Sequence, residues 1–150
     1  MTGSWILVLL VTCAATSTGC APLTFSEEGA IDFERYSRAE VAVESNATTD
    51  GRATQYLVGE LRAFSGFAQV DAAPSPSADL LLNVTVFVGA GDDDDDGDAT
   101  YASVATFEAW DAQGRLVDSG SESDESSGPL EAAEDVLDEV TLHFIAPYRL

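Results

Sequence analysis

DLLLNVTVFVG, residues 79–89, carries the strongest strand pattern in the chain. Its side chains fall into two alternating sets, an aliphatic set of Leu80, Leu82, Val84, Val86 and Val88 and a mixed set of Leu81, Asn83, Thr85 and Phe87. Successive side chains of a strand point to opposite faces of a sheet. The pattern therefore predicts a strand that is buried on one side and only partly buried on the other.

Other segments extend this strand into a sheet. Residues 101–110, a turn at 111–114 and a returning strand at 115–121 predict a three-stranded meander with it. Residues 39–44 alternate and predict an earlier strand, and residues 67–71 predict a short one. The polar, acidic residues 119–128 predict a solvated loop after the meander.

Two segments have helical spacing. In residues 52–64, Ala53, Leu57, Leu61 and Phe64 share one face, and Thr49 or Asp50 can cap the start. The second helix starts at Pro129, which suits the first position of a helix, and ends before Pro147. Its core-facing stripe is Leu130, Ala133, Leu137, Val140 and Phe144.

The predicted order is β-α-β-β-β-β-α, which belongs to the α/β (α+β) class. We expect a two-layer sandwich with two helices on one face of a mixed, mostly antiparallel sheet of about five strands. The predicted core is Val41, Val43, Leu57, Leu61, Phe64, Leu80, Leu82, Val84, Leu137, Val140 and Phe144.

Composition limits the partners. The chain of 150 residues has a formal net charge of −21, and its six cationic side chains are all arginine. Such a charge repels nucleic acid, which is bound by neutralising phosphates, and it also repels anionic lipid headgroups. A salt-adapted proteome and a GC-rich genome with acidic loops both account for the missing lysine.

The first twenty residues resemble a targeting signal. The apolar run 5–11 is shorter than the roughly 20 residues of a membrane span and fits the hydrophobic region of a signal peptide. Thr18-Gly19-Cys20 resembles the lipobox of bacterial lipoproteins. That resemblance implies cleavage between Gly19 and Cys20 and acylation of Cys20. The alternative is an ordinary secretory signal that is cut near Ala15 or Ala21.

The resemblance divides the chain into a signal peptide at 1–19, a lipidated flexible tether at 20–38 and one domain at 39–150. Cys13 would be discarded and Cys20 acylated, which leaves no thiol for a disulfide or a nucleophile. The acyl chains would be the only membrane contact. Ala21 in place of Asp after the cysteine favours, by family analogy, the periplasmic face of the outer membrane over the inner membrane.

The domain resembles a group of small envelope lipoproteins: the curli-secretion lipoprotein, the penicillin-binding-protein activator lipoprotein and the amino-terminal domain of TolB. Three segments of residues 39–146 carry the resemblance: VAVE (41–44) before a helix, SADLLLNVT (77–85) at the start of the meander, and ATFEAWDAQGRLV (105–117) around its turn. The group implies scaffolding, assembly or activation of a partner in the envelope, without catalytic residues.

The aspartate run 92–98 contains Asp-x-Asp-x-Asp-Gly, the first half of a calcium loop. Asp92, Asp94 and Asp96 would supply carboxylates, and Asp98 a carbonyl. The twelfth position is Ser103 where a calcium loop has glutamate, and the flanks are predicted strands. Weak condensation of cations and a solvated hairpin tip without ligand remain alternatives.

Nothing else in the sequence forms a catalytic set. His143 is the only histidine and is expected to be structural or on the surface, and no serine lies in a Gly-x-Ser-x-Gly context. Trp110, Phe87 and Tyr101 are expected on the exposed sheet face, either as a docking surface or as cross-strand pairs.

The sequence thus predicts a lipid-anchored, non-enzymatic envelope protein that scaffolds, assembles or activates an unknown protein partner. It needs no cofactor and binds no nucleic acid. The alternative is a secreted acidic module that responds to calcium or salt through residues 92–98.

Overall fold

A computed structural model describes residues 31–145 of the chain. The predicted signal peptide, the cleavage site between Gly19 and Cys20, the lipidation of Cys20 and the helix stop at Pro147 lie outside the described residues. No helix within residues 31–145 is long and apolar enough to cross a membrane.

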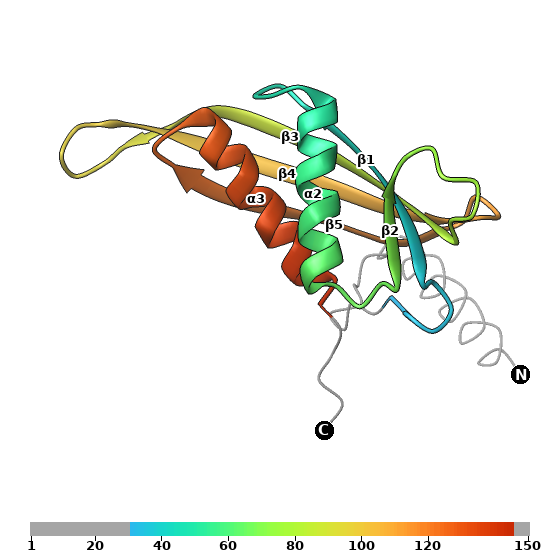
Figure 1. Cartoon of the computed structure of the whole chain (residues 1–150). Coiled ribbons are helices and arrows are strands. Elements are labelled where there is room, and N and C mark those ends of the chain that lie inside the picture. Colours follow the sequence, from blue (N-terminus) through green and yellow to red (C-terminus); the bar gives the residue numbers. More distant parts are fainter. Residues whose placement is uncertain (1–30, 146–150) are drawn as a thin grey trace, which may run out of the picture. The chain divides into compact units, whose positions relative to one another are not determined.

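Five strands form one mixed sheet in the order β2-β1-β3-β4-β5. The strands are β1 (Arg38–Ser45), β2 (Gln69–Ala72), β3 (Leu80–Asp93), β4 (Ala99–Asp111) and β5 (Leu116–Ser126). Strand β1 pairs in parallel with β2 and β3, and the β3–β4 and β4–β5 pairs are antiparallel. The two helices, α2 (Asp50–Phe64) and α3 (Pro129–His143), lie side by side on one face of this sheet (Figure 1). The predicted α+β class and element order are confirmed.

The core lies between the helices and the sheet face that β3 defines. The predicted face of β3, from Leu80 to Val88, is buried, and so is every other predicted core residue except Phe64. Phe64, the last residue of α2, is 59 % exposed, so the prediction that it joins the core is wrong. Beyond the end of α2, Phe67 packs against Phe144 with 5.8 Å between ring centroids, and these two rings occupy the core instead.

Helix α2 begins at Asp50, two residues before the predicted start, and uses the first of the two predicted caps. Thr49 is its N-cap, and the Thr49 hydroxyl oxygen accepts a hydrogen bond from the amide of Arg52 at 3.3 Å. This bond satisfies one of the amide donors that the first turn of a helix leaves unpaired. Helix α2 packs beside β1, where the hydroxyl of Thr54 accepts a hydrogen bond from the amide of Val43 at 3.1 Å.

The acidic stretch after the meander is a strand and not the predicted loop. β5 continues to Ser126, and its register with β4 runs from Ala109 opposite Asp118 to Tyr101 opposite Ser126. Backbone pairing with β4 does not require apolar side chains, so the polar composition misled the prediction.

Gly120 lets β5 approach the core. A β-carbon at this position would lie 2.6 Å from Cζ of Phe107, a distance that no real contact allows. Phe107 is almost completely buried between the sheet and α3, where its ring packs against that of Phe144 with 5.4 Å between the ring centroids. The glycine therefore leaves the space into which Phe107, the largest fully buried side chain of β4, packs.

Residues 31–38, which were predicted to belong to the tether, are part of the folded domain, and residues 20–30 lie outside the described residues. Ile31 and Tyr36 are buried in the core, and a carboxylate oxygen of Asp32 accepts hydrogen bonds from the amides of Glu34 and Arg35. The absence of any sequence period hid this segment, because a single turn anchored by two apolar side chains produces none.

His143 joins the end of α3 to β5. Its Nε2 lies 2.8 Å from Oδ2 of Asp118, and the centroid of its ring lies 4.7 Å from the centroid of the Phe107 ring. The hydrogen bond with Asp118 is the main cause that raises the pKa of His143; burial opposes it, and the charges of Asp118 and Glu122 add to it. His143 is therefore structural, and its protonated form is the one that the fold favours.

Replacing His143 with glutamine should lower stability in a pH-dependent way. Because the pKa is raised in the folded state, the stabilisation is complete below the unfolded value of about 6.5 and disappears as the pH rises through the folded value. Urea unfolding at about pH 6 should show a loss of about 2 kcal/mol for His143→Gln, and the loss should shrink by about pH 9. A loss of equal size at both pH values would contradict the ion pair.

Candidate functional site: the open face of the sheet

The sheet face opposite the helices is not covered by any other element within residues 31–145. Its side chains are the second alternating set of each strand, and they include the most exposed large apolar residues of the sheet. A soluble domain rarely leaves apolar side chains grouped on one surface unless that surface meets another molecule. This open face is the candidate functional site.

Two apolar rows cross the open face. In the first, Phe87 on β3 pairs with Val104 on β4, and these side chains are 62 % and 42 % exposed. In the second, Leu81, Trp110 and Leu116 follow one another across β3, β4 and β5. Leu81 and Phe87 are six positions apart on one strand, so the two rows are separated by about 20 Å.

Polar side chains fill the space between the rows. Asn83 pairs with Glu108, and Thr85 pairs with Thr106, and all four are exposed. The face is thus two apolar strips with a polar strip between them. Such a pattern over about 20 Å matches the size and mixed chemistry of a protein–protein contact better than that of a small ligand.

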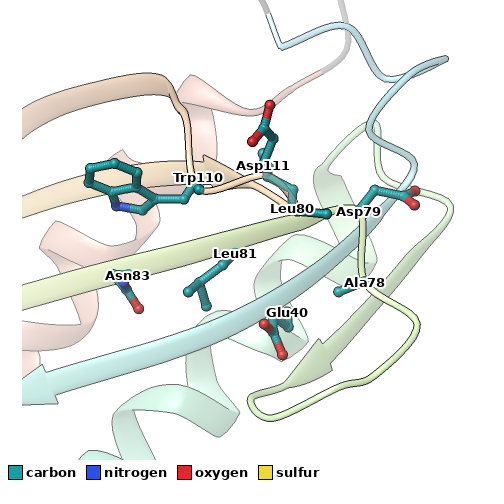
Figure 2. Close-up of a pocket in the computed structure, with 10 residues that line it drawn as sticks. Glu40, Ala78, Asp79, Leu80, Leu81, Asn83, Trp110 and Asp111 are labelled. Atoms are coloured by element: carbon teal, nitrogen blue, oxygen red, sulfur yellow. The ribbon is translucent and has the colours of Figure 1, made fainter.

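A shallow concavity of about 450 Å³ lies at the second apolar row. Leu81, Asn83 and Trp110 line it together with Glu40 from β1 and residues of the β2–β3 and β4–β5 loops (Figure 2). The indole Nε1 of Trp110 donates a hydrogen bond to Oε2 of Glu108 at 3.2 Å. The concavity therefore has an aromatic wall and carboxylates at its rim.

The carboxylates around this concavity already serve the fold. Asp111 accepts hydrogen bonds from the amides of Gln113 and Arg115, each at 2.9 Å, and also pairs with the Arg115 guanidinium. The bond from the Arg115 amide is the main cause that lowers the pKa of Asp111. Glu40 and Asp79 accept hydrogen bonds from the amides of Ser75 and Arg38. These groups therefore shape the concavity by holding its turns.

The sequence placed two of the three aromatic residues correctly. Phe87 and Trp110 lie on the open face, whereas Tyr101 lies on the helix side, where it is half-buried against the core. Tyr101 is two residues before the buried Ser103 and four before the buried Ala105, so it points to the same face of β4 as they do. The alternation of β4 therefore predicts that Tyr101 lies on the helix side. Val104 and Leu116 were missed, because only the strand register shows that they neighbour Phe87 and Trp110.

The aspartate run forms the tip of the β3–β4 hairpin, and all of its residues are exposed. Oδ1 of Asp94 accepts hydrogen bonds from the amides of Asp96 at 3.0 Å and Asp98 at 2.8 Å. Gly97 has a φ of 84°, which a glycine adopts without strain.

The predicted calcium ligands are not brought into one cluster. Within residues 31–145 there is no group of three or more histidine, cysteine, aspartate or glutamate side chains that could hold a metal ion. Asp94 instead organises the turn, and Asp92 and Asp96 lie beside it on the tip. Calcium binding at Asp92, Asp94 and Asp96 stays a prediction, and a calorimetric titration of Asp94→Ala and Asp96→Ala against the unchanged chain tests it.

Comparison with known proteins identifies the fold only. No protein-family model matches the chain, and no curated protein does. The PelC dodecamer from Paraburkholderia phytofirmans is similar to it with a TM-score of 0.56 and 23 % identity, over 75 % of this chain and 91 % of PelC. A leucine-to-methionine variant of that dodecamer gives a TM-score of 0.55 and 24 % identity, over 75 % and 90 % of the two chains. At these identities, the similarity establishes that this chain shares the fold of PelC.

Proposed function

We propose that this chain is a lipid-anchored, non-enzymatic envelope protein that scaffolds or activates a protein partner through the open face of its sheet. The observation that carries the proposal is the pair of apolar rows on that face, in which Phe87, Val104 and Leu116 are exposed and Leu81 and Trp110 are half-buried. Phe87 with Val104 and Trp110 with Leu116 present two apolar strips on a rigid sheet. Aromatic side chains are enriched in the cores of protein interfaces, and tryptophan is among the residues that carry most of the binding energy there.

Membrane attachment belongs to the same proposal. The Thr18-Gly19-Cys20 sequence supports acylation of Cys20, and the residues before the described domain, which begins at Ile31, would tether it to the acyl chains. A thioether-linked lipid together with a second acyl chain gives stable anchoring without any basic patch. A chain of net charge −21 needs such an anchor, because its surface is repelled by anionic lipids.

The partner is proposed to be a protein of different sequence. PelC, which shares the fold, assembles as a dodecamer, so a domain of this kind can be built into a large particle. Stacking copies of this chain on their open faces would bring together bodies that each carry a charge of −21. Self-repulsion of that size opposes association of identical copies at low salt, whereas a partner of opposite charge is attracted.

Metabolic labelling with a radioactive fatty acid tests the anchor. The unchanged chain should incorporate label and sediment with membranes, and Cys20→Ala should lose both properties because no thiol remains for acylation. Cys13→Ala is the matched control and should keep the label if residues 1–19 are removed. Label that survives Cys20→Ala would contradict the anchor.

Photo-crosslinking tests the open face. A benzoylphenylalanine in place of Phe87 should give a discrete crosslinked product in the envelope, because that ring would lie within the contact. The same group in place of Phe64 is the control, since Phe64 is exposed to the same extent but lies at the end of α2 on the helix layer. Equal crosslinking from both positions, or none from position 87, would contradict docking at the open face.

A further inference from the structure

The sheet has two edges of unequal length. Strand β2 has four residues, and Nε of Arg62 donates a hydrogen bond to the carbonyl of Val70 in that strand at 2.7 Å. Strand β5 has eleven residues, and within residues 31–145 it pairs only with β4. A long edge strand offers unpaired backbone groups to which another extended chain can add.

The direction of these groups follows from two local hydrogen bonds. In an antiparallel pair every second residue of an edge strand turns its N–H and C=O away from the neighbouring strand. The amide of Ser119 donates to Oδ1 of Asp118 at 2.9 Å, and the amide of Glu125 donates to Oδ1 of Asp124 at 2.7 Å. Both amides therefore belong to the outward set, and Ser121 and Ser123 lie between them at the same parity.

The two ends of this outward row differ in how firmly they are covered. Asp118 is held from the other side by His143, which bonds its second carboxylate oxygen at 2.8 Å, and its side chain is 7 % exposed. Asp124 covers the amide of Glu125, which is exposed. We therefore expect Asp124 to release its amide more easily than Asp118 does.

The edge has a strong charge of one sign. Strand β5 contains Asp118, Glu122, Asp124 and Glu125 and no lysine or arginine. The negative charge of Asp124 also acts on Asp138 in α3. Burial is the largest cause that raises the pKa of Asp138, and repulsion by the charges of Asp135 and Asp124 raises that pKa further. A second β5 strand added here would place like charges opposite one another, which destabilises a sheet.

We infer that the β5 edge binds a basic, extended segment of the partner protein by strand addition, and that Asp124 selects for that charge. In the free protein Asp124 covers the amide of Glu125. An added strand needs that amide together with those of Ser121 and Ser123. A lysine or arginine in the strand gives the displaced carboxylate a new partner, whereas a neutral strand does not. The inference rests on the proposed function, because it names the partner's chemistry.

The test uses two eight-residue peptides, one that alternates lysine with threonine and one with glutamine in place of lysine, titrated calorimetrically against the full chain. The lysine peptide should bind saturably, and hydrogen exchange should show new protection of the Ser121 and Ser123 amides. Asp124→Asn, which keeps a carbonyl to cover the Glu125 amide, should weaken the lysine peptide about fivefold. Asp124→Ala uncovers the amide and should instead strengthen the glutamine peptide.

Asp95→Asn removes the same charge at the hairpin tip, away from the edge, and should leave the affinity for the lysine peptide unchanged. If it weakens binding as much as Asp124→Asn does, the attraction is only general charge and the inference is wrong. Absence of protection at Ser121 and Ser123 would also overturn it. Crosslinking from position 87 without protection of the Ser121 and Ser123 amides would overturn the inference and leave the proposed function supported. Protection of these amides without crosslinking from position 87 would support peptide binding at the β5 edge and contradict docking at the open face.

Discussion

The structure depends on the burial of one face of β3 and β4 against the two helices. From Leu80 to Val88 every second side chain of β3 is buried, and the same holds for β4 from Ser103 to Asp111. Because side chains alternate strictly along a strand, this choice sends the remaining set to the other face. The position of Phe87 and Trp110 is therefore a consequence of how the core is packed.

The same constraint determines where β5 can lie. Phe107 fills the core beside α3, and β5 can pair with β4 at that point only because residue 120 is a glycine. Strand β5 then becomes the long edge of the sheet, with Asp118 held by His143 and Asp124 over an outward amide. The open face and the acidic edge meet along one side of the domain. Both are surfaces on which the proposed function and the edge-strand inference rest.

Much of the fold follows from the sequence because periodicity reports burial directly. Residues 79–89 specify a strand with one buried face, and the spacing of Leu57 and Leu61 specifies a helix that covers it. The failures occur where burial does not follow a period. Phe64 has the right spacing but lies at the end of its helix, where other rings fill the core. Strand β5 is held by backbone pairing, which polar side chains conceal.

The sequence predicts only part of the candidate site. The alternation of β3 places Phe87 outside, but which residues of β4 and β5 lie next to it depends on a register that includes a shift between Ala109 and Trp110. The covering of the Ser119 and Glu125 amides is a matter of side-chain conformation, which no pattern encodes.

Radical footprinting of the aromatic side chains tests most directly whether the sheet has one face for the core and one for a partner. The full chain would be labelled once as purified protein and once within intact envelopes. Phe107 should stay unlabelled in both states, because it is 1 % exposed. Phe87 should label strongly in the purified protein and become protected in the envelope, while Phe64 labels in both. Labelling of Phe107 comparable to that of Phe87, or equal labelling of Phe87 and Phe64 in the envelope, would contradict the account.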